Sequence, residues 1–225
     1  MKLDRAAQYI YSRLDDLAFG PGGGSILKPK GWYPGCWRED TAIIPSEVQL
    51  RAALDYYYLD ADSDSERHFI NLYLLNSIDI PKYIPERFER DKQLITAKVL
   101  GAYKLLTLEL PQFRTIMDKA LTGQRMSDAD LETIDEAINY RGYRQVERDG
   151  TWVIEKKTAD DTRELLKALY EVVVAVTQRN ARIAMCALET CEKVFIQNPS
   201  GSEQKYCCDY HRVRAYQLRK RAVSH

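Results

Sequence analysis

The residues best suited to chemistry gather near the C-terminal end of the chain, where four of its five cysteines lie. Cys186 and Cys191 form a Cys-x4-Cys pair, and after fifteen intervening residues Cys207 and His211 form a Cys-x3-His pair. Zinc takes four nitrogen or sulfur ligands in a tetrahedron, usually as two close pairs that the fold brings together. The spacing therefore predicts a zinc site built from Cys186, Cys191, Cys207 and His211.

Cys208 is a further candidate ligand, because it adjoins Cys207. Adjacent cysteines rarely bind one tetrahedral ion, since the chain between them is too short, so we expect Cys207 with His211 and keep Cys208 as the alternative to either. Four reduced, packed cysteines without a metal are the competing interpretation. A catalytic zinc is disfavoured, because no glutamate stands in an H-x-E position. We expect a structural Zn²⁺ that stabilises a module with very little core of its own.

A basic segment follows the predicted ligands directly. Between Lys205 and Arg221 there are six Lys or Arg residues and one acid, Asp209, so the segment carries 6 − 1 = +5 and the rest of the neutral chain carries −5. Helical spacing predicts a short helix here, and a helix carrying arginines can reach phosphates. A solvated charged helix is the alternative. The residues expected to contact nucleic acid are Arg212, Arg214, Tyr216, Arg219, Lys220 and Arg221.

The sequence that precedes the predicted zinc module indicates a mainly helical body, which must position that module. Apolar residues at helical spacing predict helices over 3–19, 46–59, 65–78 and 91–108. Pro111 is expected to interrupt the last of these, with helical spacing resuming over 112–121.

The next helix is predicted from a capping box. Ser127 with Asp130 three residues on is typical of a helix start, and Leu131, Ile134 and Ile138 are its predicted buried stripe.

A β-hairpin and a last body helix complete the prediction. Asp149-Gly150 lies between two alternating arms in "YRQVERDGTWVIEK", a strong hairpin signal. Thr158 with Asp161 predicts the start of a helix over about 160–184 that leads directly into Cys186. Beyond it, Val194 and Phe195 are expected to pack beside the metal, and Asn-Pro-Ser-Gly at 198–201 suits a reversal between two short strands. The fold class is therefore mainly α with a small β-hairpin, followed by a zinc ribbon or finger and a basic helix.

Two glycine-containing stretches read as loops. "FGPGGGS" at 19–25 lacks the Gly-Lys-Ser/Thr of a phosphate loop and is expected to be flexible. The aromatic segment Gly31–Asp40, "GWYPGCWRED", either pins a loop to the core or lines a ligand pocket, and Cys36 within it is expected to be packed and free.

Composition indicates a soluble cytoplasmic chain. Hydrophobic residues make up 45% and charged residues 29%, no apolar run reaches the length of a membrane span, and the N-terminal residues lack the apolar stretch of a signal peptide. Five cysteines, four of them clustered, in such a reducing compartment favour metal binding over disulfides.

The C-terminal half resembles the CGNR-type zinc-finger proteins, whose preceding region is called the ABATE domain. The resemblance runs from "MSDADLETIDEAIN" through "VERDGTWVIEK" and "RIAMCALETCEKVF" to "KYCCDYHRVRAYQLRKR". Cys186 and Cys191 match the family's first pair, Tyr206-Cys207 matches its aromatic-Cys, and the segment 211–214, His-Arg-Val-Arg, stands where the family has Cys-Gly-Asn-Arg. Only the final Arg of that tetrapeptide is kept, and the spacing is one residue shorter. The resemblance implies a bacterial cytoplasmic protein with a helical sensor region, a zinc finger and a role in DNA-binding regulation.

The leading hypothesis is a DNA-binding transcriptional regulator in two parts. Residues 1–184 would form the helical body, holding a small-molecule effector or a dimer contact, and residues 185–225 the zinc finger with its basic helix. A zinc-stabilised protein-interaction module and an RNA-binding protein are the alternatives. An enzyme is least expected, because His68, His211 and His225 are the only histidines and no nucleophile–base pair is visible in the sequence.

Overall fold

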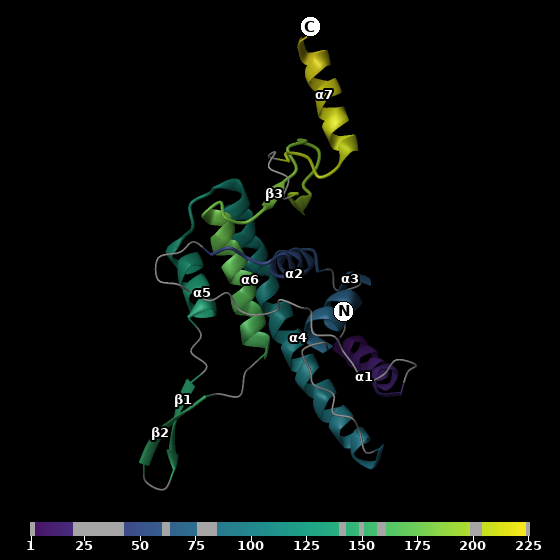
Figure 1. Ribbon diagram of the computed structural model, residues 1–225, viewed down its shortest axis with the longest axis vertical. Coiled ribbons are helices and arrows are strands. Elements are labelled where there is room, and N and C mark those ends of the chain that lie inside the picture. Colours follow the sequence, from purple (N-terminus) through teal and green to yellow (C-terminus); the bar gives the residue numbers. More distant parts are fainter. Residues whose placement is uncertain are drawn as a thin grey trace.

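The fold is mainly helical, as the sequence predicts, and two small antiparallel sheets of two strands each occur in the described part of the chain. The computed structural model describes residues 3–19, 43–59, 64–75, 85–139, 143–148, 151–156, 161–198 and 204–223. Figure 1 shows the long helix α4 crossing the molecule and the last helix, α7, leading away from the body. In chain order the elements are α1 (Leu3–Phe19), α2 (Glu47–Tyr57), α3 (Asp64–Phe69), the π-helix η1 (Ile70–Leu75), α4 (Pro85–Thr122), α5 (Asp128–Ile138), β1 (Tyr143–Arg148), β2 (Thr151–Lys156), α6 (Asp161–Thr177), β3 (Ile183–Met185), β4 (Val194–Ile196) and α7 (Asp209–Val223).

The main core is organised by aromatic side chains that join α2, α4 and α6. The ring of Phe113 lies 4.9 Å from that of Tyr56 and 5.5 Å from that of Tyr170, measured between centroids. All three side chains are buried. The hydroxyl of Tyr56 also donates to the carbonyl of Leu106 at 2.6 Å, so the buried phenol is satisfied. The three helices are thereby held in one packed body.

Helix α4 is continuous through Pro111, which corrects the predicted interruption at that residue. Proline removes one backbone donor and normally costs about 3 kcal/mol inside a helix. Here Leu110 and Phe113 beside it are buried, and burial of such side chains contributes about 1.5–3 kcal/mol each. Packing on both sides of Pro111 therefore outweighs the local cost.

The predicted capping box of α5 is confirmed, but the predicted buried stripe is partly wrong. The Ser127 hydroxyl accepts from the backbone N–H of Asp130, and the Asp130 carboxylate accepts from the backbone N–H of Ser127. The same carboxylate accepts from Nζ of Lys119 at 2.6 Å. This ion pair turns Asp130 inward together with Ile134, so Leu131 is left 52% exposed.

Helix α6 ends at Thr177, which corrects the predicted helix over 160–184. The backbone N–H groups of Asn180 and Ala181 both donate to the carbonyl of Ala175, and Arg179 has φ of 59°. This left-handed turn closes the helix end and directs the chain into β3 instead of directly into Cys186. The proposed division of the chain after residue 184 stays a prediction.

The remaining sequence predictions are partly confirmed. The first helix has the predicted bounds, the hairpin strands β1 and β2 pair antiparallel, and 65–78 begins as α3 but continues as the unpredicted π-helix η1. None of the helices in the described ranges is long and apolar enough to cross a membrane. The loop over 20–25, the Gly31–Asp40 segment, the Asp149-Gly150 turn, Thr158 and residues 199–203 lie outside the described residues.

Candidate metal centre and C-terminal helix

The first ligand pair lies in the connection between β3 and β4. Cys186 follows β3 directly, and its backbone N–H donates to the carbonyl of Lys193 at 2.9 Å. The backbone N–H of Cys191 donates to the carbonyl of Leu188 at 2.7 Å, which closes a tight turn. The short strands thus flank the first cysteine pair, not the later Asn-Pro-Ser-Gly segment as the sequence suggested.

The second ligand pair lies at the start of α7. Cys207 precedes the helix, and His211 lies in its first turn. The backbone N–H of Ala187 donates to the carbonyl of Lys205 at 2.8 Å, which ties the chain before Cys207 to the first pair. A backbone hydrogen bond therefore joins the two segments that carry the ligand pairs, independently of any bound ion.

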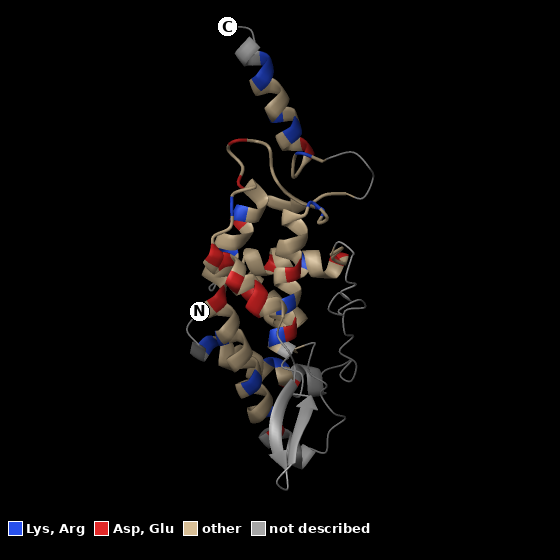
Figure 2. Ribbon diagram, turned by 90° about the vertical axis from the view of Figure 1, so that its left-hand side faces the viewer, with Lys and Arg blue, Asp and Glu red and all other residues tan. Residues whose placement is uncertain are grey.

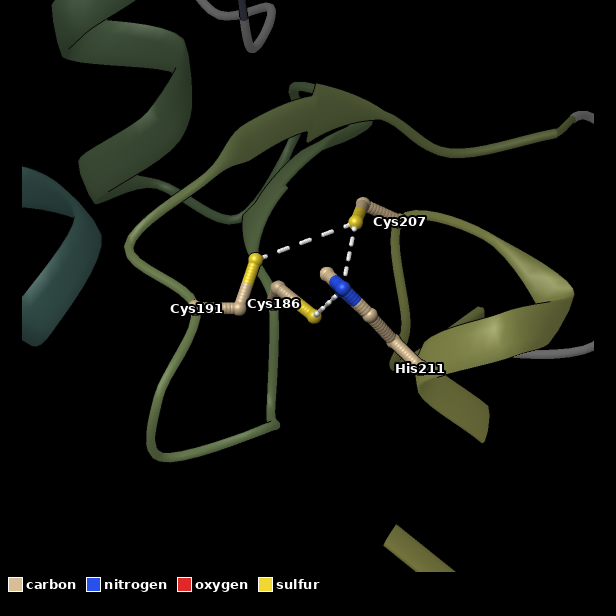
Figure 3. A group of neighbouring side chains, drawn as sticks. All are labelled: Cys186, Cys191, Cys207 and His211. Atoms are coloured by element: carbon tan, nitrogen blue, oxygen red, sulfur yellow. Dashed lines mark hydrogen bonds between the residues drawn. The ribbon is translucent and has the colours of Figure 1, made fainter. Parts of the chain in front are cut away.

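The four predicted ligands converge on one point (Figure 3). The sulfurs of Cys186, Cys191 and Cys207 and a ring nitrogen of His211 all lie within 4.8 Å of one another, and this group of possible metal ligands is the one found among the described residues. The sulfurs of Cys191 and Cys207 are 3.9 Å apart, and Nδ1 of His211 lies 3.6 Å from the sulfur of Cys186. A tetrahedral zinc site has sulfur–sulfur distances of about 3.8 Å and sulfur–nitrogen distances of about 3.5 Å. The cluster can hold a metal ion of this kind.

The histidine presents Nδ1 to the sulfurs. This atom lies 3.1 Å from the sulfur of Cys207 as well as 3.6 Å from that of Cys186. A ring nitrogen that binds a metal must carry no proton, so the proton of a neutral ligating His211 would be on Nε2.

The surroundings of Cys186 and Cys207 shift the pKa values of the two thiols in opposite directions. Burial opposes ionisation of Cys186, but hydrogen bonds from the backbone at Cys207 and Leu188 and from His211 lower its pKa to about 6. Burial and the neighbouring thiols, Cys186 and Cys191 among them, raise the pKa of Cys207 to about 12. A bound divalent cation would supply the positive charge that lets all three sulfurs become thiolates.

Cys208 lies beside the cluster without belonging to it. Its sulfur is 4.0 Å from that of Cys207, and its side chain is exposed. The geometry thus favours Cys207 over Cys208 as the ligand.

The β3–β4 ribbon has two faces with different neighbours. Ile183, Val194 and Ile196 pack with the main core, whereas Ala184 and Phe195 pack with a small cluster beside the metal ligands. That cluster also contains Leu188 from the turn and Ala215 from α7. Phe195 therefore packs beside the ligands as predicted, but Val194 does not, because successive strand residues point to opposite faces.

Tyr58 of the helical body binds the backbone of this ribbon, a contact that the spacing of residues in the sequence did not predict. The hydroxyl of Tyr58, at the end of α2, accepts from the backbone N–H of Val194 at 2.5 Å and lies 3.4 Å from the carbonyl of the same residue. The carbonyls of Tyr57 and Leu59 on either side accept from the guanidinium of Arg114 in α4, both at 2.7 Å. The only signal in the sequence is the run of three tyrosines at 56–58, of which Tyr58 faces the ribbon.

The residues predicted to contact nucleic acid lie along α7. Arg212, Arg214, Tyr216, Arg219 and Lys220 all have exposed side chains, and Arg221 lies in the last turn of the helix. Figure 2 shows Lys and Arg along α7, whereas Asp and Glu gather on the helices of the body. The basic helix α7 therefore lies at one end of the chain, beyond the cluster of cysteines and histidine.

No family model, curated protein or solved structure matches this chain.

Proposed function

We propose that this protein is a DNA-binding transcriptional regulator in which a structural Zn²⁺ holds a basic helix at a fixed angle to the helical body. The observation that carries the proposal is the convergence of Cys186, Cys191, Cys207 and His211 immediately before α7. Four protein ligands fill a tetrahedral site and leave no position for water or substrate, which is typical of structural zinc. We accordingly propose no enzymatic activity.

The charge of α7 supports a polyanionic partner. The helix carries Arg212, Arg214, Arg219, Lys220 and Arg221 against a single acid, Asp209. Arginine and lysine contact phosphates and release counterions, which supplies most non-specific affinity for DNA.

The resemblance to CGNR-type zinc-finger proteins becomes part of the same proposal. It is supported by the convergence of the positions that match the family's cysteine motif, with His211 in place of the fourth cysteine. A bacterial source, a cytoplasmic location and a small-molecule effector for the body are what the resemblance implies, and they belong to this proposal on that ground alone.

The first experiment measures zinc in the purified chain, wild type beside Cys191→Ser. We expect one zinc per chain in the wild type and none in the variant, because three ligands hold the ion far less tightly. A freshly reduced wild-type preparation that takes up no zinc would contradict the proposal.

The second experiment measures duplex DNA binding as a function of salt. Five phosphate contacts predict a log–log slope of about −4 to −5. Removal of zinc, or the Cys191→Ser change, should weaken binding because α7 is then no longer fixed. Affinity that does not change with salt would count against phosphate contacts.

RNA binding is the second candidate, and one observation favours it. Tyr210 and Tyr216 on α7 are 65% and 61% exposed, and exposed aromatic rings can stack on unpaired bases. Competition between duplex DNA and single-stranded RNA of equal length distinguishes the two. A protein partner that co-purifies while neither nucleic acid binds would instead indicate an interaction module.

A further inference from the structure

The orientation of α7 about its own axis is set by its contacts with the metal ligands. His211 points its Nδ1 at two of the sulfurs, and Ala215, one turn later, is 8% exposed in the small cluster with Cys186 and Phe195. The line through these two residues therefore marks the face of α7 that is directed toward the ligands.

Two rows of arginines flank that face. At 100° per residue, Arg212 and Arg214 lie about 80° to either side of the line through His211 and Ala215. Arg219 and Arg221 follow seven residues later, which returns each to within about 20° of the same flank and about 10 Å further along the axis. The helix thus has one arginine row on each side, roughly 160° apart.

A third set of residues lies on the outer face between the two rows. Val213 and Tyr216 are 49% and 61% exposed, and Gln217 is also exposed. These residue types are suited to base edges: glutamine pairs bidentately with adenine, and apolar atoms contact the thymine methyl group. Lys220 lies on the same face and is exposed, and its long flexible side chain can reach a phosphate. No described element of the body covers this face in Figure 1, where α7 leads away from the rest of the molecule.

The contacts described for Arg212, Arg214 and Arg219 are weak, and those of Arg212 and Arg214 are exposed. Arg212 pairs with Asp209 at 3.1 Å, with side chains 68% and 88% exposed, and Nη1 of Arg214 lies 3.3 Å from the hydroxyl of Tyr210. Nε of Arg219 lies 3.4 Å from the carbonyl of Ala215. An exposed ion pair such as that between Arg212 and Asp209 contributes little to stability, so a phosphate can replace it at small cost.

This arrangement fits a groove better than a flat surface. The major groove of duplex DNA is about 12 Å wide and admits a helix whose diameter with side chains is about 10–12 Å. A helix in the groove has a phosphate strand along each flank and base edges beneath its outer face. A flat acidic protein surface, or a single strand, would meet one arginine row and leave the other in solvent.

We propose that α7 is a recognition helix for the major groove of duplex DNA, in which the arginine rows bind the two phosphate strands and Val213, Tyr216 and Gln217 read base edges. This inference rests on the proposed DNA-binding function and extends it to sequence recognition.

The test begins by selecting bound sequences from a random duplex library with the full-length zinc-loaded protein. The selected duplex is then compared with a scrambled duplex for the wild type, Arg212→Ala/Arg219→Ala and Gln217→Ala. Circular dichroism and one zinc per chain confirm that each variant is folded. A further duplex carries 7-deazapurines, which remove an acceptor from the major groove alone.

We expect the two kinds of variant to behave differently. Loss of both arginines should weaken binding to the selected and scrambled duplexes alike and reduce the salt slope by about 2. Gln217→Ala should leave the salt slope unchanged and reduce the preference for the selected duplex by about five- to a hundredfold. The 7-deazapurine duplex should lose the same preference.

Two contrary outcomes are distinguishable. If duplex DNA binds in a salt-dependent way but no sequence is enriched, or 7-deazapurines have no effect, the recognition helix is wrong while the proposed DNA binding stands. If the zinc-loaded protein binds no duplex DNA, or prefers single-stranded RNA, the proposed function itself fails.

Discussion

At the scale of single residues, the chain provides its own control for the candidate metal centre, because a ligand cysteine has a non-ligand cysteine as its neighbour. Cys207 and Cys208 are neighbours in sequence, yet the sulfur of Cys207 is 3.9 Å from that of Cys191 and Cys208 is exposed. Two adjacent residues therefore offer the same chemistry with different geometry. Replacing each of the two in turn tests whether zinc binding needs the thiol at the ligand position or merely a thiol nearby.

We predict that Cys208→Ser keeps one zinc per chain and Cys207→Ser loses it. The reason is that serine is a poor zinc ligand and only Cys207 lies within reach of the other three ligand atoms. Atomic absorption on both reduced variants, with circular dichroism as the folding control, checks this. Zinc kept equally by both variants would mean that either sulfur can bind the ion, and zinc lost equally from both would mean that both thiols are needed.

At the scale of the element, helix α5 shows how one residue of a capping box, Asp130 at N3, influences which face of a helix is buried. Asp130 accepts from Lys119 and from both the hydroxyl and the backbone N–H of Ser127. These contacts lower the pKa of Asp130 to about 2 from its ordinary 3.8, with the Lys119 hydrogen bond as the largest cause. Because the folded-state pKa lies below the unfolded one, the carboxylate stabilises the fold above about pH 4, and that contribution is lost as pH falls toward 2.

We predict that Asp130→Ala lowers the free energy of unfolding at pH 7 by about 1–2 kcal/mol, because the capping box loses its N3 carboxylate and Lys119 loses its partner. The difference from wild type should shrink as pH falls from about 4 to 2, because the wild-type carboxylate then becomes protonated. Urea unfolding followed by circular dichroism at several pH values measures it. Asp128→Ala, in the same first turn but exposed, should cost only a few tenths of a kcal/mol. A gap between Asp130→Ala and wild type that does not change with pH would contradict the ion pair.

At the scale of the whole molecule, the ribbon that carries the first ligand pair is joined to the helical body. Ile183 and Val194 pack in the main core, and Tyr58 binds the backbone of Val194. Arg114 in turn holds the carbonyls on either side of Tyr58. The ligand cluster and the body should therefore unfold together, and metal bound at the cluster should stabilise α2, α4 and α6 as well as the ribbon.

We predict that chelation of zinc lowers the melting temperature of the helical signal in the wild type, and lowers it less in Tyr58→Phe. The phenylalanine variant should itself lose about 1–2 kcal/mol, because the backbone N–H of Val194 loses its partner. Melting curves with and without chelator measure the coupling. Tyr57→Phe is the matched control, since its hydroxyl donates to Asp118 within the body. Identical chelator-induced shifts in Tyr58→Phe and wild type would show that the contact between Tyr58 and Val194 does not couple the two parts.

The sequence by itself determined the features that depend on local spacing and on side-chain chemistry. The ligand types, the capping box at Ser127 and the basic character of α7 depend on residues a few positions apart or on charge alone, so they could be read from the chain. Tertiary contacts decided the rest. Packing around Pro111 kept α4 whole, the Lys119–Asp130 pair left Leu131 exposed, and the turn at Arg179 ended α6 early enough for β3 to form. The contact between Tyr58 and Val194 joins residues 136 positions apart. No local pattern encodes such a pair, because its free energy arises only after the helices have packed.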